Sequence, residues 1–241
     1  MRFVAALTAG LAVCVHLHGA SVPSSAVPSQ KQKPPAFSKS SIEVPLLFER
    51  NIGQAPADAQ FVSRTSTGVA LIGSAGTKLL VRSSDGQDAE VRMQVRRAHL
   101  GAGQPEGAMP SYSNYLLGSD RSKWQRNVPH YSKIRYKNVY PGIELLYYGT
   151  QGRLEYDFVV APGADYSVIE LAFDGADRLR TDSNGDLLID VAGTTIRQWK
   201  PKVYQTSRSG GKTEIAAAYR ISNGGVRFAL GRHDRSRELV I

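Results

Sequence analysis

Three acidic side chains gather on one short stretch of the chain, where closely spaced carboxylates would suit acid–base catalysis or calcium binding. Within residues 140–165, Glu144, Glu155 and Asp157 stand among tyrosines and aliphatic residues. Two carboxyl groups about 5 to 5.5 Å apart are the arrangement of a retaining glycosidase, and a cluster of oxygens can hold Ca²⁺. The third interpretation is the charged back of a strand pair, which does no chemistry.

A basic stripe comes just before these acids in the sequence. Lys133, Arg135 and Lys137 alternate with Ile134 and Tyr136. Cations beside the carboxylates would keep them ionised, whereas a general acid needs a raised pKa. We therefore favour a lattice of surface ion pairs, with a glycan-directed enzyme and a calcium site as the alternatives.

Two β-rich runs, "IELLYY" and "RLEYDFVV", carry the acids and are separated by four residues. We expect a hairpin whose four-residue loop pairs Tyr148 with Arg153. That register gives one apolar face and puts Glu144 directly opposite Asp157 on the other. Like charges so placed repel, so neighbouring cations must compensate.

The basic stripe is expected to supply this compensation. A turn at residues 138–142 would fold the stripe back onto "IELLYY". Matching the apolar faces of the two strands places Lys137 near Glu144 and Arg135 near Leu146.

Other candidates for chemistry are weaker. Asp182, Asn184 and Asp186 resemble the start of a calcium loop, but Gly185 is one position early and an Asn-Gly hairpin turn explains the same residues. No serine lies in a G-x-S-x-G elbow, and the histidines show no metal-ligand spacing. No metal site and no cofactor is predicted.

Trp124 is flanked by Lys123 and Arg126. It could stack on a sugar ring or cap the core, and we favour the core because large aromatic side chains mostly bury their area.

Short apolar runs separated by turn residues predict an all-β fold. Val91, Met93 and Val95 alternate with polar residues, as in a half-buried strand. Further turns are predicted at Asn184-Gly185, Gly210-Gly211 and Gly224-Gly225, and no stretch of ten residues has a helical period. The expected architecture is an antiparallel β-sandwich of two sheets. A glycine-rich loop at 101–110 is a candidate sub-boundary between an N-terminal and a larger C-terminal portion, which would make the sandwich an extended one.

The N-terminal residues have the pattern of an export signal. Arg2 precedes an apolar run too short to span a bilayer, and cleavage is expected after Ala26, or alternatively after Ala20. A lipoprotein anchored at Cys14 is a further alternative. Residues 27–41 are rich in Pro, Ser and Lys and predict a linker, so the folded module should span 42–241.

Composition narrows the compartment and the partners. Cys14 is the only cysteine, so the mature chain would have no disulfide, and its formal charge would be 29 − 21 = +8 against 30 − 21 = +9 for the whole chain. A basic exported protein meets anionic polymers or cell-surface glycans rather than nucleic acid. No transmembrane segment is expected once the signal is removed.

Several ordered motifs resemble a known family: "FERNIGQ" (48–54), "SNYLLGSDRSKWQRNVPHYSKIRYKNVYPGIELLYYG" (113–149), "LEYDFVVAPGAD" (154–165), "FDGADRL" (173–179), "NGDLLI" (184–189), "KPKVYQ" (200–205) and "RELVI" (237–241). Together they look like the N-terminal module found ahead of seven-bladed β-propeller-type (SBBP) repeats in large exported bacterial proteins. The resemblance implies a β-rich module of unknown function in an extracellular or cell-surface location, and it carries over no catalytic residues.

In the proteins that this chain resembles, the segment similar to "LVI" leads into propeller repeats, whereas this sequence stops at Ile241. Two interpretations stay open, a truncated product of a longer gene and a free-standing module. The expected function is a non-enzymatic module for adhesion or interaction at the bacterial cell surface, with polysaccharide or an envelope protein as partner. The alternatives are a glycan-directed enzyme and a module that binds calcium or an anionic polymer.

Overall fold

The computed structural model describes residues 45–65, 68–82, 86, 88–207 and 210–241, which belong to one compact unit that begins at Ile42. The predicted signal peptide and linker lie outside the described residues. Within the described residues the regular elements are β-strands and two 3₁₀ turns, η1 (Arg121–Lys123) and η2 (Tyr166–Val168). No helix there is long and apolar enough to cross a membrane.

The first nine strands are β1 (Phe48–Arg50), β2 (Phe61–Thr65), β3 (Gly68–Gly73), β4 (Gly76–Arg82), β5 (Asp88–Val95), β6 (Gln104–Tyr115), β7 (Gln125–Tyr140), β8 (Ile143–Thr150) and β9 (Arg153–Val160). The others are β10 (Leu171–Asp174), β11 (Arg178–Thr181), β12 (Leu187–Val191), β13 (Thr194–Gln198), β14 (Val203–Thr206), β15 (Lys212–Ile215), β16 (Ala217–Ser222), β17 (Gly225–Leu230) and β18 (Leu239–Val240). The predicted strands around residues 69–72, 78–81 and 91–95 are confirmed as β3, β4 and β5.

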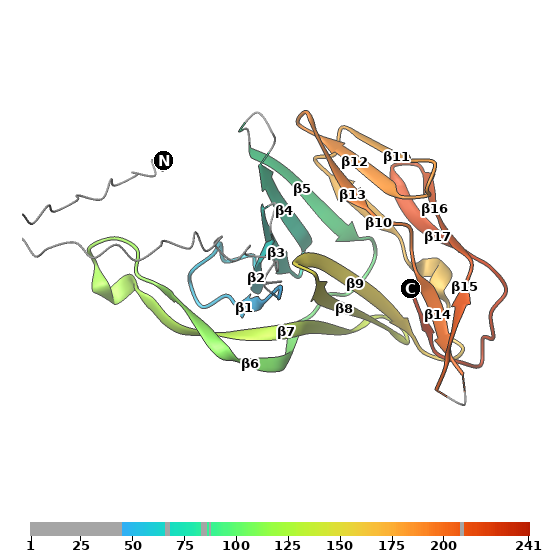
Figure 1. Cartoon of the computed structure of the whole chain (residues 1–241), viewed down its shortest axis with the longest axis horizontal. Helices are drawn as coiled ribbons and strands as arrows, with labels where there is room; N and C mark the ends of the chain where they lie inside the picture. Colours follow the sequence, from blue (N-terminus) through green and yellow to red (C-terminus); the bar gives the residue numbers. More distant parts are fainter. Residues whose placement is uncertain (1–44, 66–67, 83–85, 87, 208–209) are drawn as a thin grey trace, which may run out of the picture. The chain divides into compact units, whose positions relative to one another are not determined.

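Fifteen of these strands form one antiparallel sheet (Figure 1). Its order is β15-β14-β18-β9-β8-β7-β1-β2-β3-β4-β5-β10-β17-β16, with β6 paired to β7. The strands at the two ends of this order, β15 and β16, follow each other in the chain with only Ala216 between them. One bent segment therefore pairs with β14 at one end of the sheet and with β17 at the other, which nearly closes the sheet into a barrel-like shape.

The prediction of an all-β antiparallel fold is confirmed, but the strands are not arranged as two separate sheets of a sandwich. The sixteen-residue strand β7 pairs with β1, β6 and β8, so it joins the N-terminal strands and the later ones in a single sheet. Alternation of apolar residues decides which face of a strand is buried, but not which strands pair. The second sheet is small, with β11, β12 and β13 in order.

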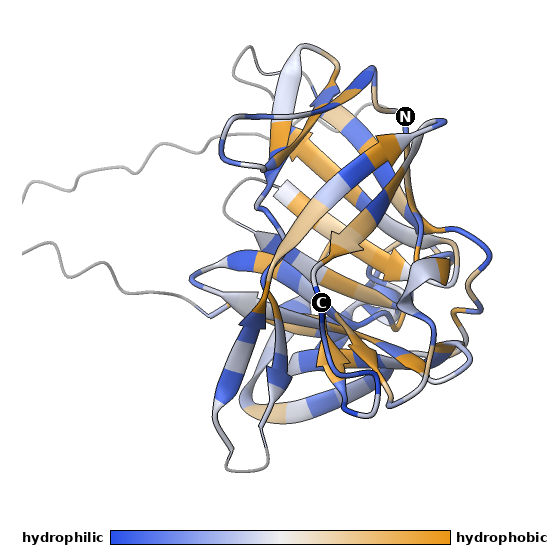
Figure 2. Cartoon of the chain, turned by 90° about the vertical axis from the view of Figure 1, so that its right-hand side faces the viewer, coloured by the Kyte–Doolittle hydropathy of each residue, from blue (hydrophilic) through white to orange (hydrophobic). Residues whose placement is uncertain are grey.

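The core fills the interior of the curved sheet. Its largest fully buried side chains include Phe48, Phe61, Tyr136, Tyr147 and Phe158, which come from five different strands. Alternate residues of β12, among them Leu187 and Ile189, join the same core and so fasten the small sheet to the large one. In Figure 2 the apolar residues (orange) lie mainly along the strands, where bands of polar residues (blue) lie between them.

The glycine-rich segment at 101–110 is only partly a loop. From Gln104 onward the chain is strand β6, which forms a long hairpin with β7. Proline and glycine are tolerated there because β6 pairs only with β7 among the described strands and so is an edge strand.

Candidate functional site

The hairpin that carries the acids has a register shifted by two residues from the expected one. β8 and β9 continue to Thr150 and Arg153, and the loop is only Gln151-Gly152, with φ of 52° and 72°. Positive φ at both positions is the conformation of a type I′ turn, which matches the twist of the two strands. A shift of two residues keeps each side chain on its face, so the predicted apolar face is confirmed.

The same shift separates the predicted carboxylate pair. Glu144 lies opposite Val159, and Asp157 lies opposite Leu146, although both acids stay on the same face of the sheet. The prediction that Glu144 and Asp157 face each other directly is therefore wrong.

Glu144 is held by the basic stripe. Arg135 lies opposite Leu146, as expected, and its Nη1 is 2.7 Å from Glu144 Oε2. Its Nε is 2.6 Å from Oε1 of Glu106 on β6, an acid that the sequence analysis missed. Hydrogen bonding to Arg135 holds the pKa of Glu106 below its usual value and raises that of Arg135.

Lys137 does not occupy the place predicted for it beside Glu144. An irregularity in the pairing of β7 with β8 begins after Tyr136, so Lys137 has no paired residue on β8. Arg135 instead forms the ion pair with Glu144. Lys133 lies opposite Tyr148. Both lysines are exposed, and their charges help to lower the pKa of Glu106.

Glu155 and Asp157 belong to a different environment, because both line a cleft of about 630 Å³. Burial raises the pKa of Asp157, and the neighbouring charge of Glu155 adds to the rise. The Tyr148 hydroxyl donates to Asp157 Oδ1 at 2.9 Å and opposes it, as do the more distant charges of Lys212 and Lys133. The expectation that nearby cations would keep every carboxylate pKa low thus fails for Asp157, because burial outweighs them.

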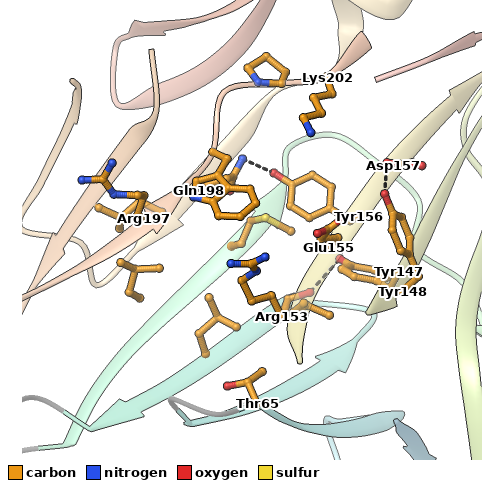
Figure 3. A pocket seen from close by; sticks show the side chains of 18 of the residues that line it. Thr65, Tyr147, Tyr148, Arg153, Glu155, Tyr156, Asp157, Arg197, Gln198 and Lys202 are labelled. Atoms are coloured by element: carbon orange, nitrogen blue, oxygen red, sulfur yellow. Dashed lines mark hydrogen bonds between the residues drawn. The ribbon is translucent and has the colours of Figure 1, made fainter. Parts of the chain in front are cut away.

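We call this cleft the tyrosine cleft, after Tyr147, Tyr148, Tyr156, Tyr204 and Tyr219, which line it (Figure 3). β4, β8 and β9 contribute to its walls, as do the end of β13, the connection to β14, and the strands β14 to β17. Residues far apart in the sequence meet there because β9 and β14 are both bound to the short strand β18.

A hydrogen-bond chain orders the polar groups of the tyrosine cleft. The Gln198 Nε2 donates to the hydroxyls of Tyr156 at 2.6 Å and of Tyr219 at 2.8 Å, and Tyr219 donates its own proton to the Trp199 carbonyl at 2.7 Å. Within the described residues, the Tyr156 hydroxyl proton and the Gln198 Oε1 have no partner. One donor and one acceptor are therefore left to a ligand.

Trp199 stands at the edge of the cleft with 49% of its surface exposed. The guanidinium of Arg153 lies 4.1 Å from the centre of its ring, so a residue of β9 meets a residue that follows β13. Arg197, Lys200, Lys202 and Lys212 add further positive charge to the cleft lining. Burial raises the pKa of Tyr147 to about 12 and that of Tyr219 to about 12, so both stay neutral at physiological pH.

The family to which this chain belongs is shown by a match over residues 48–241 to the model of the domain of unknown function DUF7948. The chain is a DUF7948 domain. No curated protein and no solved structure matches it.

Trp124 lies away from the tyrosine cleft, in the connection between β6 and β7 of the DUF7948 domain. The guanidinium groups of Arg121 and Arg126 lie 5.4 and 5.1 Å from its ring centre, and its indole N–H donates to the Gly118 carbonyl at 3.1 Å. It belongs to neither of the core clusters of the described residues. The prediction of a core role is wrong, because two arginines rather than apolar side chains cover the ring.

The calcium-like segment is a turn in this structure. Backbone N–H groups of Asn184 and Asp186 donate to Asp182 Oδ1, and Arg197 Nη1 lies 3.0 Å from both Asp182 and Asp186. Among the residues that the structure describes, no three His, Cys, Asp or Glu side chains come together in a way that could hold a metal ion.

Gln198, Trp199 and Tyr219 are among the cleft residues that the sequence analysis did not single out. Tyr219 and Ile221 alternate with Arg220 in an ordinary strand pattern, and Trp199 stands in a short polar link before Pro201. No local signal marks these residues, because the segments that carry them are brought to β9 by the tertiary fold.

Proposed function

We propose that this DUF7948 domain is an exported binding module of the bacterial cell surface, and that its tyrosine cleft takes up, without hydrolysing it, a polyhydroxylated ligand such as a segment of polysaccharide. The observation that carries the proposal is the cleft itself, which combines tyrosine rings with an open Tyr156 donor and an open Gln198 acceptor. Sugar rings present apolar C–H faces to aromatic rings and hydroxyls to such donors and acceptors. The N-terminal signal pattern and the resemblance to modules that precede SBBP repeats support the location.

The charges around the cleft favour an acidic ligand. Lys200, Lys202 and Lys212 lie on its lining, whereas Arg135 of the basic stripe and Arg197 of the lining are each paired with two carboxylates. An anionic polymer would therefore meet the cleft lysines before the stripe. This agrees with the basic composition of the chain, whose formal charge is +9.

Alanine substitutions in the cleft test the proposal. Against a panel of acidic and neutral polysaccharides, Trp199→Ala and Gln198→Ala should each weaken binding about tenfold, which corresponds to about 1.4 kcal/mol of lost stacking or hydrogen bonding. Trp124→Ala is the matched control, because Trp124 is also covered by arginines but lies on the β6–β7 hairpin. Equal loss in both tryptophan variants would refute the cleft as the binding site.

A glycan-directed enzyme is the second candidate, and the raised pKa of Asp157 favours it. Residues two apart on one strand are separated by about 6.6 Å along its axis, which is closer to the spacing of an inverting glycosidase than of a retaining one. In the same panel, Asp157→Asn and Glu155→Gln decide between the two. A binding module keeps its affinity and releases no reducing ends, whereas an enzyme shows turnover that both variants abolish.

A further inference from the structure

A second polar cluster lies outside the tyrosine cleft, where three neighbouring strands meet. Glu49 of β1 and His130 of β7 are direct cross-strand partners, and β6 on the other side of β7 brings Ser111 and Ser113. Glu49 is 6% exposed and His130 is 8% exposed, so both are buried polar residues. Ser111, in contrast, is exposed.

The distances join these residues in one chain. Ser111 Oγ lies 2.9 Å from His130 Nδ1, and Ser113 Oγ lies 2.8 Å from His130 Nε2. Ser113 Oγ is also 2.6 Å from Glu49 Oε1, which itself is 3.4 Å from His130 Nε2. The imidazole is therefore held between two serines, with a carboxylate behind one of them.

Accounting for the protons fixes the tautomer of His130. An ionised carboxylate only accepts hydrogen bonds, so the single hydroxyl proton of Ser113 goes to Glu49. Ser113 Oγ must then accept from His130, which places the ring proton on Nε2. In the neutral ring Nδ1 carries a bare lone pair, and Ser111 donates its hydroxyl proton to it.

Glu49 is kept in the ionised state that this argument needs. Burial alone would raise its pKa, but hydrogen bonds from Ser113 and Tyr115, together with the charge of Arg64, hold the pKa below its usual value. The Tyr115 hydroxyl donates to Oε2, and Arg64 Nη1 lies 3.3 Å from the same oxygen.

We propose that Ser111 is an activated nucleophile, with His130 as its general base and Glu49 as the group that orients His130 through Ser113. The arrangement is that of a Ser–His–acid relay, and it suits transfer of an acyl group from a carboxylic ester. β6 is paired only with β7 among the described strands, so the backbone N–H groups of its other edge are the candidate donors to the oxyanion.

The step balances with water as the only co-reactant. Ser111 Oγ forms a bond to the ester carbonyl carbon while its proton passes to His130 Nδ1. The bond from that carbon to the leaving oxygen then breaks, and the leaving alkoxide takes the proton back from His130. Water repeats the sequence on the acyl-serine, which restores the free hydroxyl and releases the acid.

A fluorophosphonate probe tests the proposal on the intact protein, because it reacts with activated serines and the modified residue is identified by peptide mass spectrometry. Ser122 is the matched comparison, since it is also exposed but its hydroxyl lies 2.6 Å from the Asp120 carboxylate instead of an imidazole. We expect Ser111 to be labelled at least about 100-fold faster than Ser122, the scale of general-base catalysis. Labelling of Ser111 no faster than that of Ser122 would overturn the proposal.

Two variants separate the relay from a merely structural network. Ser111→Ala, at an exposed position, should fold normally by circular dichroism, lose the label and lose hydrolysis of p-nitrophenyl acetate. His130→Gln should keep Ser111 in place and yet lower its labelling at least about 100-fold. Unchanged labelling in a folded His130→Gln protein would contradict the role of His130, and neither result depends on what the tyrosine cleft binds.

Discussion

Replacing Glu170 with alanine should lower the free energy of unfolding by about 2 kcal/mol, because the change removes the carboxylate to which three arginines donate hydrogen bonds. Arg96 Nη1 and Arg97 Nη2 lie 2.9 and 3.0 Å from its oxygens, and Arg227 of β17 binds the same group. The Glu170 side chain is 11% exposed, whereas the side chains of the three arginines are 41%, 69% and 44% exposed, so water replaces part of what the arginines lose.

Position in the sheet explains why so much depends on one acid. Glu170 immediately precedes β10, which pairs with β5 on one side and β17 on the other, and it thus ties together three strands near one end of the sheet order. Urea denaturation measures the effect. The control is Glu90→Ala, where the lost partner is Lys78 at 3.4 Å and the acid is 54% exposed, and the expected change is within about 1 kcal/mol. Equal effects in the two variants would contradict the role given to Glu170.

The Glu170 contribution should also depend on pH. Burial acts to raise its pKa, but the arginines outweigh burial and hold the pKa below the ordinary value of 4.5. A lowered native pKa stabilises the fold fully above the unfolded value, and the gain is lost as the pH falls through the native value. The difference in stability between the wild type and Glu170→Ala should therefore be constant near neutral pH and shrink below about pH 4.5.

Gly76→Ala is expected to be strongly destabilising in the hairpin of β3 and β4. Gly76 has φ of 106°, and an added Cβ would lie 2.3 Å from the carbonyl oxygen of Met93 on β5. Backbone must move to accept it, so we expect a loss of more than about 3 kcal/mol.

A second glycine separates the two causes of that loss. Gly163 has φ of 80° but nothing lies within 4 Å of an added Cβ, so Gly163→Ala should cost only the backbone strain of about 1 kcal/mol. Thermal denaturation of both variants measures the difference. An equal loss of stability in the two variants would contradict the close approach of Gly76 on β4 to the Met93 carbonyl on β5.

Short-range patterns in the sequence predicted the strands but not how they join. Alternation identified the buried faces of β5, β7, β8 and β9 correctly, since burial follows the two-residue period. Closure depends on β15 and β16, which are one segment bent at Ala216 and paired at opposite ends of the sheet. No local sequence pattern specifies a pairing between strands at opposite ends of a sheet, so the sequence predicts a sandwich of two sheets instead.

The candidate site was also predicted only in part, because local patterns indicate contacts between neighbouring strands but not contacts made by the tertiary fold. Glu155 and Asp157 do line the cleft, and Arg135 does hold Glu144, because both relations follow from neighbouring strands. The Gln198 and Trp199 side of the cleft comes from a segment that meets β9 only through the tertiary fold. The remaining error is the register of β8 with β9. It arose because the Gln151-Gly152 loop is two residues shorter than the predicted loop.

The most direct test of the tyrosine cleft uses its own tryptophan as the reporter. In the Trp124→Phe protein, Trp199 is the single remaining tryptophan of the two in the sequence. Titration with an acidic oligosaccharide that the protein retains should change its emission in a saturable way, with the same midpoint as binding measured by calorimetry. Calorimetric binding with no change in Trp199 emission, and with unaltered affinity in Trp199→Ala, would contradict the proposal that the cleft holds the ligand.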